Sequence, residues 1–194
     1  MALDVNNDGV DDLVVGAPLH DAGGGAGADR GRAYVYFGGS PPDANADITI
    51  SGTENGGMLG AAVSRAGDAN GDGVADFLVG APLEDPGGLV DAGRAYLFFG
   101  GSAVDGIPDL TLNGTETRGH FGAAVAGPGD INQGGRDLLI GAPLDDADGN
   151  ATDDGLDRGR VFVFFGGPGV LDNVRDATIN GPQNGAHAGT AIAN

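Results

Sequence analysis

The chain has no cysteine and no tryptophan among its 194 residues, and all nine of its basic residues are arginine rather than lysine. Without cysteine there are no disulfide bonds, and the redox compartment cannot be inferred from them. No apolar run approaches the roughly 20 residues that a membrane-spanning helix needs, so we expect no membrane insertion. The net charge of −19 excludes nucleic acid as a natural partner, because phosphate would be repelled.

Acidic residues and glycine are in excess. An acidic surface without lysine suits high salt, where screening suppresses self-repulsion between like charges. We therefore hypothesise a salt-adapted microbial source; a GC-rich genome that replaces lysine by arginine is the alternative. The 40 glycines are roughly three times the usual share. Because hydrophobic runs recur between them, they indicate tight turns and close backbone contacts rather than disorder.

One phrase recurs at a spacing of about 62 residues, which marks a repeat architecture. It reads Asp-x-Asn-x-Asp-Gly-x-x-Asp, followed by an apolar run and Gly-Ala-Pro. Full copies begin at Asp4 and Asp68, and a degenerate copy begins at Asp130. Each repeat should be one supersecondary unit that stacks on its neighbours.

Each repeat also carries short apolar segments, which we name strands A to D in chain order. Strand C is aromatic, begins with arginine and ends in Gly-Gly in all three copies. Four-stranded units at this period predict an all-β fold, a β-propeller built from four-stranded antiparallel blades, with three blades in this chain. The strands expected in the second and third repeats are residues 60–63, 77–79, 94–99, 109–112, 121–125, 138–140, 160–165 and 177–179.

The phase of the repeat predicts how the domain is organised. We expect one domain over residues 1–194 that starts without a strand A, whereas the C-terminal residues align with strand A of the third repeat. The expected parts are strands B to D of blade one (1–52), blade two (53–114), blade three (115–181), and a strand A that completes blade one of a partner chain (182–194).

Three blades are too few to close a ring of the usual four to eight. Two copies could close a six-bladed homodimer by exchanging their C-terminal strands. Alternatively, the chain is a fragment of a longer propeller. We favour the dimer, because an open fragment would expose two blade faces and one unpaired strand edge.

The repeated acidic phrase predicts calcium sites. It places side-chain oxygens at positions 1, 3, 5 and 9 and a backbone carbonyl at position 7, and Ca²⁺ prefers six to eight oxygen ligands. An EF-hand is excluded, because position 12 is Val15 or Val79 instead of glutamate. The predicted ligands are Asp4, Asn6, Asp8, the Val10 carbonyl and Asp12 in the first loop, and Asp68, Asn70, Asp72, the Val74 carbonyl and Asp76 in the second.

The third loop is shorter, lacks the carboxylate at position 5 and carries Arg136 just before its last acidic residue. We expect it to bind Ca²⁺ weakly or not at all. Its only candidate side chains are Asp130, Asn132 and Asp137.

Together with the Phe121-Gly122 pair and the Gly-Ala-Pro triplets, these loops resemble the FG-GAP repeats of the integrin α-subunit propeller, over essentially the whole chain. The resemblance implies a Ca²⁺-bearing β-propeller, usually extracellular, in which the metal is structural. Two copies depart from Phe-Gly, with Leu59-Gly60 and Ala188-Gly189. The family's propeller has seven blades in one chain, so we transfer no ligand site.

The loops of antiparallel blades alternate between two faces. Calcium should lie on the A–B and C–D face, while acidic B–C loops at 19–29, 83–92 and 144–157 share the other face with the D–A loops. These B–C loops are either a binding surface or cation site, or simply solvated acidic loops. No nucleophile–base arrangement is visible.

The sequence therefore predicts a non-enzymatic extracellular or cell-surface scaffold for adhesion or interaction, with a possible protein or glycan ligand on the B–C and D–A face. The alternatives are a carbohydrate-binding or enzyme-accessory propeller, and a purely structural repeat protein without a ligand.

Overall fold

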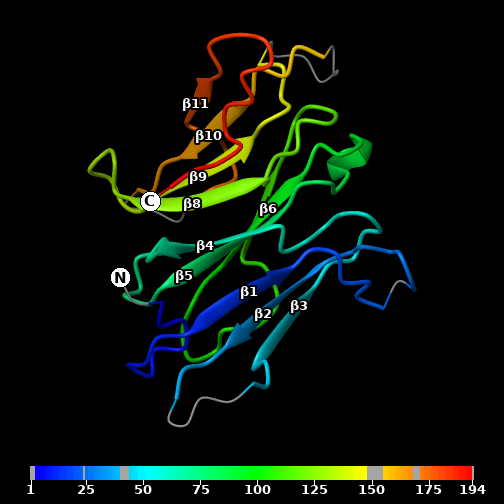
Figure 1. Ribbon diagram of the computed structural model, residues 1–194. Coiled ribbons are helices and arrows are strands. Elements are labelled where there is room, and N and C mark those ends of the chain that lie inside the picture. The colour runs from blue at the N-terminus through cyan, green and yellow to red at the C-terminus, as the bar shows by residue number, and fades with distance from the viewer. Residues whose placement is uncertain (1–2, 24, 40–43, 148–154, 168–170, 194) are drawn as a thin grey trace.

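Three antiparallel sheets follow one another along the chain and pack face against face in the computed structural model (Figure 1). Apart from one short 3₁₀-helix, η1 (Pro86–Gly88), every regular element in the described part is a strand. The all-β class is therefore confirmed, and the three sheets are consistent with propeller blades. The residues that the structure describes are 3–23, 25–39, 44–147, 155–167 and 171–193.

The first sheet has three strands, β1 (Leu13–Ala17), β2 (Arg32–Tyr36) and β3 (Ile48–Ser51), in that order. Each pairs antiparallel with the next. Within the described residues no strand pairs with the outer edge of β1, as the phase of the repeat predicts. The backbone groups along that edge are consequently open to another strand.

The second and third sheets each have four strands in chain order, so each is a simple meander. We refer to the three as the first, second and third sheet. In the second and third sheets, the pairing between the first and second strands is irregular just before the acidic loop. The strands of the second sheet are β4 (Ala62–Gly67), β5 (Asp76–Ala81), β6 (Arg94–Phe98) and β7 (Leu110–Asn113), and those of the third are β8 (Ala124–Gly129), β9 (Asp137–Ala142), β10 (Arg160–Phe164) and β11 (Ala177–Asn180).

Strand A lies later in the chain than the sequence suggested. The expected segments 60–63 and 121–125 begin before the observed strands β4 and β8. Gly60 and Gly122 have φ angles of +89° and +91°, so they form the turn into the strand. Gly60 and Gly122 each donate a backbone N–H bond at 2.9 Å to the next strand of their own sheet, at Gly80 and Gly141, and they also contact the neighbouring sheet.

That contact joins the glycine of each Gly-Ala-Pro to the glycine that opens the next strand A. A Cβ atom placed on Gly16 would lie 1.9 Å from the carbonyl oxygen of Gly60, and one on Gly80 would lie 2.0 Å from that of Gly122. Both distances are far below van der Waals contact, so only glycine allows the two backbones to approach this closely.

Two apolar layers fill the space between the sheets. Between the first and second sheets, the Phe77 and Phe98 rings stack with centroids 4.9 Å apart. Between the second and third, Phe121 meets the edge of Phe162 at 5.2 Å. Aromatic pairs of this kind stabilise a core beyond the area they bury. The buried clusters that contain these pairs draw residues from two neighbouring sheets each, and so join the sheets.

The C-terminal segment 182–194, predicted as a strand exchanged with a partner chain, makes one isolated bridge within its own chain. Ala188 bridges Gly159 in the same way that Leu59 bridges Gly31. A Cβ atom on Gly141 would lie 2.1 Å from the Gly189 carbonyl oxygen, which repeats the glycine contact described above. Residues 189–193 form no strand in this single chain, and Asn194 lies outside the described residues.

Candidate metal centre and contacts between the sheets

The first acidic loop wraps its side chains around its own backbone. The Asp4 carboxylate accepts N–H bonds from Asp8 at 3.1 Å and Gly9 at 2.9 Å. Asn6 Oδ1 accepts from Asp8 N at 3.0 Å, and Asp8 Oδ1 accepts from Val10 N at 2.8 Å. These bonds gather the side-chain oxygens of positions 1, 3 and 5 on the inside of one turn.

The second loop, which joins β4 to β5, has nearly the same pattern. Asp68 accepts from Gly73 N at 3.0 Å, Asn70 Oδ1 from Asp72 N at 3.0 Å, and Asp72 Oδ1 from Val74 N at 2.8 Å. The repeated sequence thus folds twice into one geometry, which brings together the predicted ligands of positions 1, 3 and 5.

The aspartate at position 9 of each loop is buried and forms different hydrogen bonds from those at positions 1 and 5. Asp12, Asp76 and Asp137 are buried, and each spans two backbone amides, one in its own loop and one in the turn after strand C. These bonds hold the A–B loop and the C–D turn together at the same end of the strands in each sheet. The donors, at 2.6–2.9 Å, are Val5 and Gly38 for Asp12, Ala69 and Gly100 for Asp76, and Ile131 and Gly166 for Asp137.

The third loop keeps this bridge but loses much of the rest. Asp130 Oδ1 accepts from Gln133 N at 2.5 Å, and Asn132 Oδ1 accepts from Gly134 N at 2.8 Å, with no carboxylate at position 5. Arg136 extends along Gly67 and, with Asp68, lines a small cleft of about 150 Å³ beside the second loop. The retained Asp137 indicates that position 9 stabilises the fold independently of metal.

The donor chemistry of the two full loops fits Ca²⁺. Each offers three carboxylates, an amide oxygen and a backbone carbonyl, which are the hard oxygen ligands that this ion prefers. In the described part of the chain, no three His, Cys, Asp or Glu side chains are already grouped as a metal site. Metal binding would therefore require the side chains to exchange some of their bonds to the loop amides for bonds to the ion.

Burial also affects the second loop electrostatically. It raises the pKa of Asp76 to about 6; the N–H bonds from Gly100 and Ala69 offset part of this rise, and the charge of Asp72 adds to it. A cation bound beside Asp76 would favour the ionised carboxylate, so metal binding there would release a proton below about pH 6.

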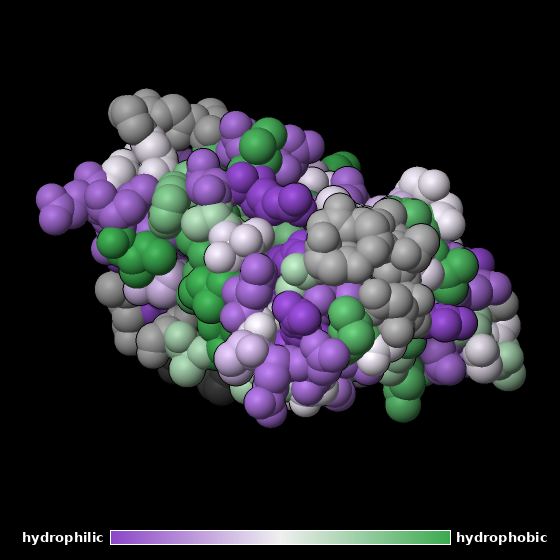
Figure 2. Space-filling model, turned by 90° about the horizontal axis from the view of Figure 1, so that it is seen from above, coloured by the Kyte–Doolittle hydropathy of each residue, from purple (hydrophilic) through white to green (hydrophobic). Residues whose placement is uncertain are grey.

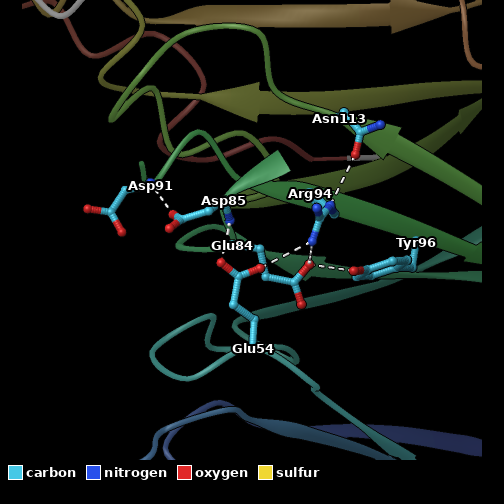
Figure 3. A network of polar contacts seen from close by, with 7 residues as sticks. All are labelled: Glu54, Glu84, Asp85, Asp91, Arg94, Tyr96 and Asn113. Atoms are coloured by element: carbon cyan, nitrogen blue, oxygen red, sulfur yellow. Dashed lines mark hydrogen bonds and ion pairs between the residues drawn. The ribbon is translucent and has the colours of Figure 1, made fainter. Parts of the chain in front are cut away.

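At the strand ends that lie away from the acidic loops, a polar network ties the first sheet to the second (Figure 3). Arg94 Nη1 lies 2.9 Å from Glu84 Oε2 and 3.3 Å from Glu54 Oε2. Glu54, in the loop that links the two sheets, also accepts the Asp85 N–H at 2.9 Å. The hydroxyl of Tyr96 donates to Glu84, and burial together with this bond raises the Tyr96 pKa, so the donor stays protonated.

Sequence reasoning missed this network, because its members lie between 10 and 40 residues apart in the chain. A signal was nevertheless present, since every copy has arginine at the first position of strand C and a titratable residue two positions after Gly-Ala-Pro. These pairs are His20 with Arg32, Glu84 with Arg94, and Asp145 with Arg160.

The acidic B–C loops are less solvated than the sequence suggested. Asp145 and Asp146, which were considered part of a solvated acidic loop, are buried. Of the other acidic residues of that loop, those at 148, 153 and 154 lie outside the described residues, and Asp157 donates its N–H to Asp146 at 2.7 Å. Viewed from above the arrangement of Figure 1, hydrophilic residues alternate with small hydrophobic patches (Figure 2).

None of the helices in the described part has the length and apolarity needed to cross a membrane.

Comparison with known proteins agrees with this arrangement. The family model described as FG-GAP repeat matches residues 1–36 and 60–98. Integrin alpha-5 of Xenopus laevis is 33% identical over 181 residues, which are 91% of this chain and 16% of that protein. Integrin alpha-IIb of Homo sapiens is 41% identical over 106 residues, 51% of this chain and 9% of that protein.

A second kind of relative is the phosphatidylinositol-glycan-specific phospholipase D of Homo sapiens, 32% identical over 200 residues, which are 94% of this chain and 23% of that protein. The chain thus spans less than a quarter of the length of each of these relatives. With its repeated acidic loops, its Gly-Ala-Pro contacts and these matches, the chain carries FG-GAP repeats and resembles the N-terminal propeller region of the integrin α-subunits.

Proposed function

We propose that this chain is a calcium-binding, non-enzymatic propeller that acts outside the cell as a scaffold for adhesion or interaction. The observation that carries the proposal is the pair of full acidic loops with matching hydrogen bonds, set in FG-GAP repeats. The ion would be held by Asp4, Asn6, Asp8, Val10 and Asp12, and by the corresponding residues of the second loop. When bound, its double positive charge would offset part of the negative charge of the three carboxylates and add binding free energy to folding.

The chain's own residues explain why metal binding would stiffen one face. Each position-9 aspartate already fixes its loop to the next turn of the same sheet. A metal ligated by the same loop would therefore restrain two connections at once. The other face, where the network around Arg94 holds the B–C and D–A loops, is left available for a protein or glycan ligand.

Calcium titration by calorimetry tests the metal assignment. We expect two sites per chain, and Asp8→Ala and Asp72→Ala, which remove a ligand oxygen, should each remove one of them. Asp11→Ala is the matched control, because it removes a carboxylate from the first loop outside the ligand set. An unaltered number of sites in Asp8→Ala and Asp72→Ala would contradict the assignment.

The phospholipase D relatives favour a second candidate, a propeller that is accessory to an enzyme or binds carbohydrate. A third candidate is a purely structural repeat protein. Binding assays on arrays of glycans and extracellular proteins, run with calcium, separate the three. A protein ligand supports the proposal, a glycan supports the second candidate, and no binding across the arrays supports the third.

We also propose that two copies close a six-bladed ring. On the open side of the first sheet, Leu13 and Val15 are 58% and 38% exposed. Their counterparts in the second sheet, Phe77 and Val79, are fully buried against the first. The first sheet thus presents the apolar face that elsewhere packs on a preceding blade.

The third sheet presents the complementary face. Ile179 is 58% exposed, whereas its counterpart Leu112 is fully buried between the second and third sheets. The C-terminal segment already makes the glycine contact of a next strand A, through Gly189 and Gly141. A second copy would bring that segment beside the open edge of β1. Blades of a longer propeller are the alternative occupants of both faces.

A further inference from the structure

Three carboxyl groups are buried together where the second sheet meets the third. Glu116, in the link after β7, is 2% exposed, and Asp145 and Asp146, after β9, are as deeply buried. Glu116 Oε1 accepts the Asp146 N–H at 2.5 Å. The Arg160 guanidinium reaches the cluster, with its Nη2 at 3.2 Å from Asp145 Oδ1. If all three carboxyls were ionised, three like charges would lie close together in a buried site.

The equivalent joint between the first and second sheets is better supplied with donors. There Arg94 contacts both Glu54 and Glu84, and the Tyr96 hydroxyl adds a donor to Glu84. In the third sheet Phe162 occupies the position of Tyr96, so that hydroxyl is missing.

Two atoms in the third-sheet cluster show the consequence. Within the described part of the chain, Glu116 Oε2 and Arg160 Nε are buried without a hydrogen-bond partner. An ionised carboxylate oxygen left unpaired in a buried site is costly, whereas a protonated carboxyl can itself donate to a neighbouring carboxylate.

Electrostatics agrees with the geometry. Burial raises the pKa of Glu116 to about 8; the negative charges of Asp145 and Asp146 add to the rise, and the Asp146 N–H bond offsets part of it. Arg175 bonds to Thr115 beside Glu116 and lies over the Phe162 ring, 5.4 Å from its centroid. The charged and titratable groups around Glu116 are Asp145 and Asp146 from the β9–β10 loop, Arg160 from β10, Arg175 from the segment before β11, and His120 from its own link.

We propose that Glu116 is uncharged at neutral pH and donates its proton to Asp145, which makes the joint between the second and third sheets dependent on protonation. The same contact fixes the start of the β9–β10 loop, because Glu116 holds the Asp146 amide and Asp146 Oδ1 holds that of Asp157 at 2.7 Å. Loss of the proton in alkaline solution places three like charges in the joint and loosens this loop.

The sign of the effect on stability follows from the direction of the shift. Between the ordinary value for glutamate, 4.5, and about 8, the folded protein holds a proton that the unfolded chain has lost. Stability from this group therefore falls as pH rises through that window, by about tenfold in the folding equilibrium constant per pH unit, and levels off above it. Asp76 and His120 titrate below pH 7, so the range from pH 7 to 9 isolates Glu116.

The first test is the ¹³C NMR titration of the Glu116 carboxyl in the calcium-loaded protein. We expect a midpoint near pH 8; a midpoint below pH 6 would overturn the proposal.

The second test compares denaturant unfolding of wild type and Glu116→Gln, which mimics the uncharged side chain. The ratio of their folding constants should fall about tenfold between pH 7 and 8, then level off. Glu54→Gln is the matched control at the equivalent joint, and its ratio to wild type should show no such fall. Parallel pH profiles for wild type and Glu116→Gln would refute the proposal.

Discussion

At the scale of single residues, the position-9 aspartates combine two roles. Asp12 and Asp76 are predicted ligands, yet their oxygens also accept backbone amides from two separate connections. Asp137 makes the same two bonds in a loop with few ligands. The third loop, which lacks the position-5 carboxylate, thus keeps the same bridge between its two connections.

Asparagine at position 9 should therefore have two distinct effects. Asp137→Asn and Asp76→Asn each leave one buried amide without a carboxylate acceptor, and each should lower the free energy of unfolding by about 1–3 kcal/mol in chelator. Only Asp76→Asn should also remove a calcium site. Denaturant unfolding with and without calcium measures both effects, and equal loss of calcium binding in the two variants would contradict the account.

At the scale of elements, the Gly-Ala-Pro motif is a spacer between neighbouring sheets. The Gly80 position accepts no Cβ atom, because the Gly122 carbonyl oxygen would lie 2.0 Å away. The contact connects strand β5 to the turn that opens β8, so it sets the distance between the second and third sheets.

Gly80→Ala should push these sheets apart and lower the free energy of unfolding by about 1–3 kcal/mol, as overpacking of a core does. Gly167→Ala is the matched control, since a Cβ atom there meets nothing within 4 Å. Thermal or denaturant unfolding of the two variants provides the comparison. Equal stability of both would show that the glycine contact does not determine the spacing.

The sequence was most informative where a signal repeats. The alternation of Asp-x-Asn-x-Asp-Gly with apolar runs predicts three units of short strands, and three antiparallel sheets are present. The predicted strand A begins too early in the second and third sheets, because it includes the turn residues Gly60 and Gly122. Those glycines have positive φ and contact the neighbouring sheet, which strand periodicity cannot show.

The polar contacts where neighbouring sheets meet could not be predicted in the same way. Glu54 bonds to Asp85 and Arg94, which lie 31 and 40 residues further along the chain. A pairing over such a separation depends on how the sheets pack, and no local pattern encodes it. Likewise, Asp145 and Asp146 look solvated in an acidic stretch but are buried by the packing of Glu116 and Arg160 against them.

At the scale of the whole molecule, the two outer faces and the C-terminal segment belong to one proposal. Deleting residues 186–194 should remove the strand that completes the first sheet of a second copy and leave single chains. Ile192→Asp, in the same segment, should weaken the assembly by placing a charge beside the open edge of β1. Sedimentation velocity measures both, and a deletion variant that keeps the mass of the intact assembly would rule out strand exchange.

The account as a whole depends on a calcium-stabilised ring formed by two copies. Its most direct test is the solution mass by light scattering after size exclusion, measured first with calcium and then with chelator. We expect a single species of about twice the 19.0 kDa chain mass in calcium, with lower thermal stability in chelator. A monomer or a broad series of aggregates in calcium would contradict the closed ring, and an unchanged melting temperature in chelator would contradict the role of the metal.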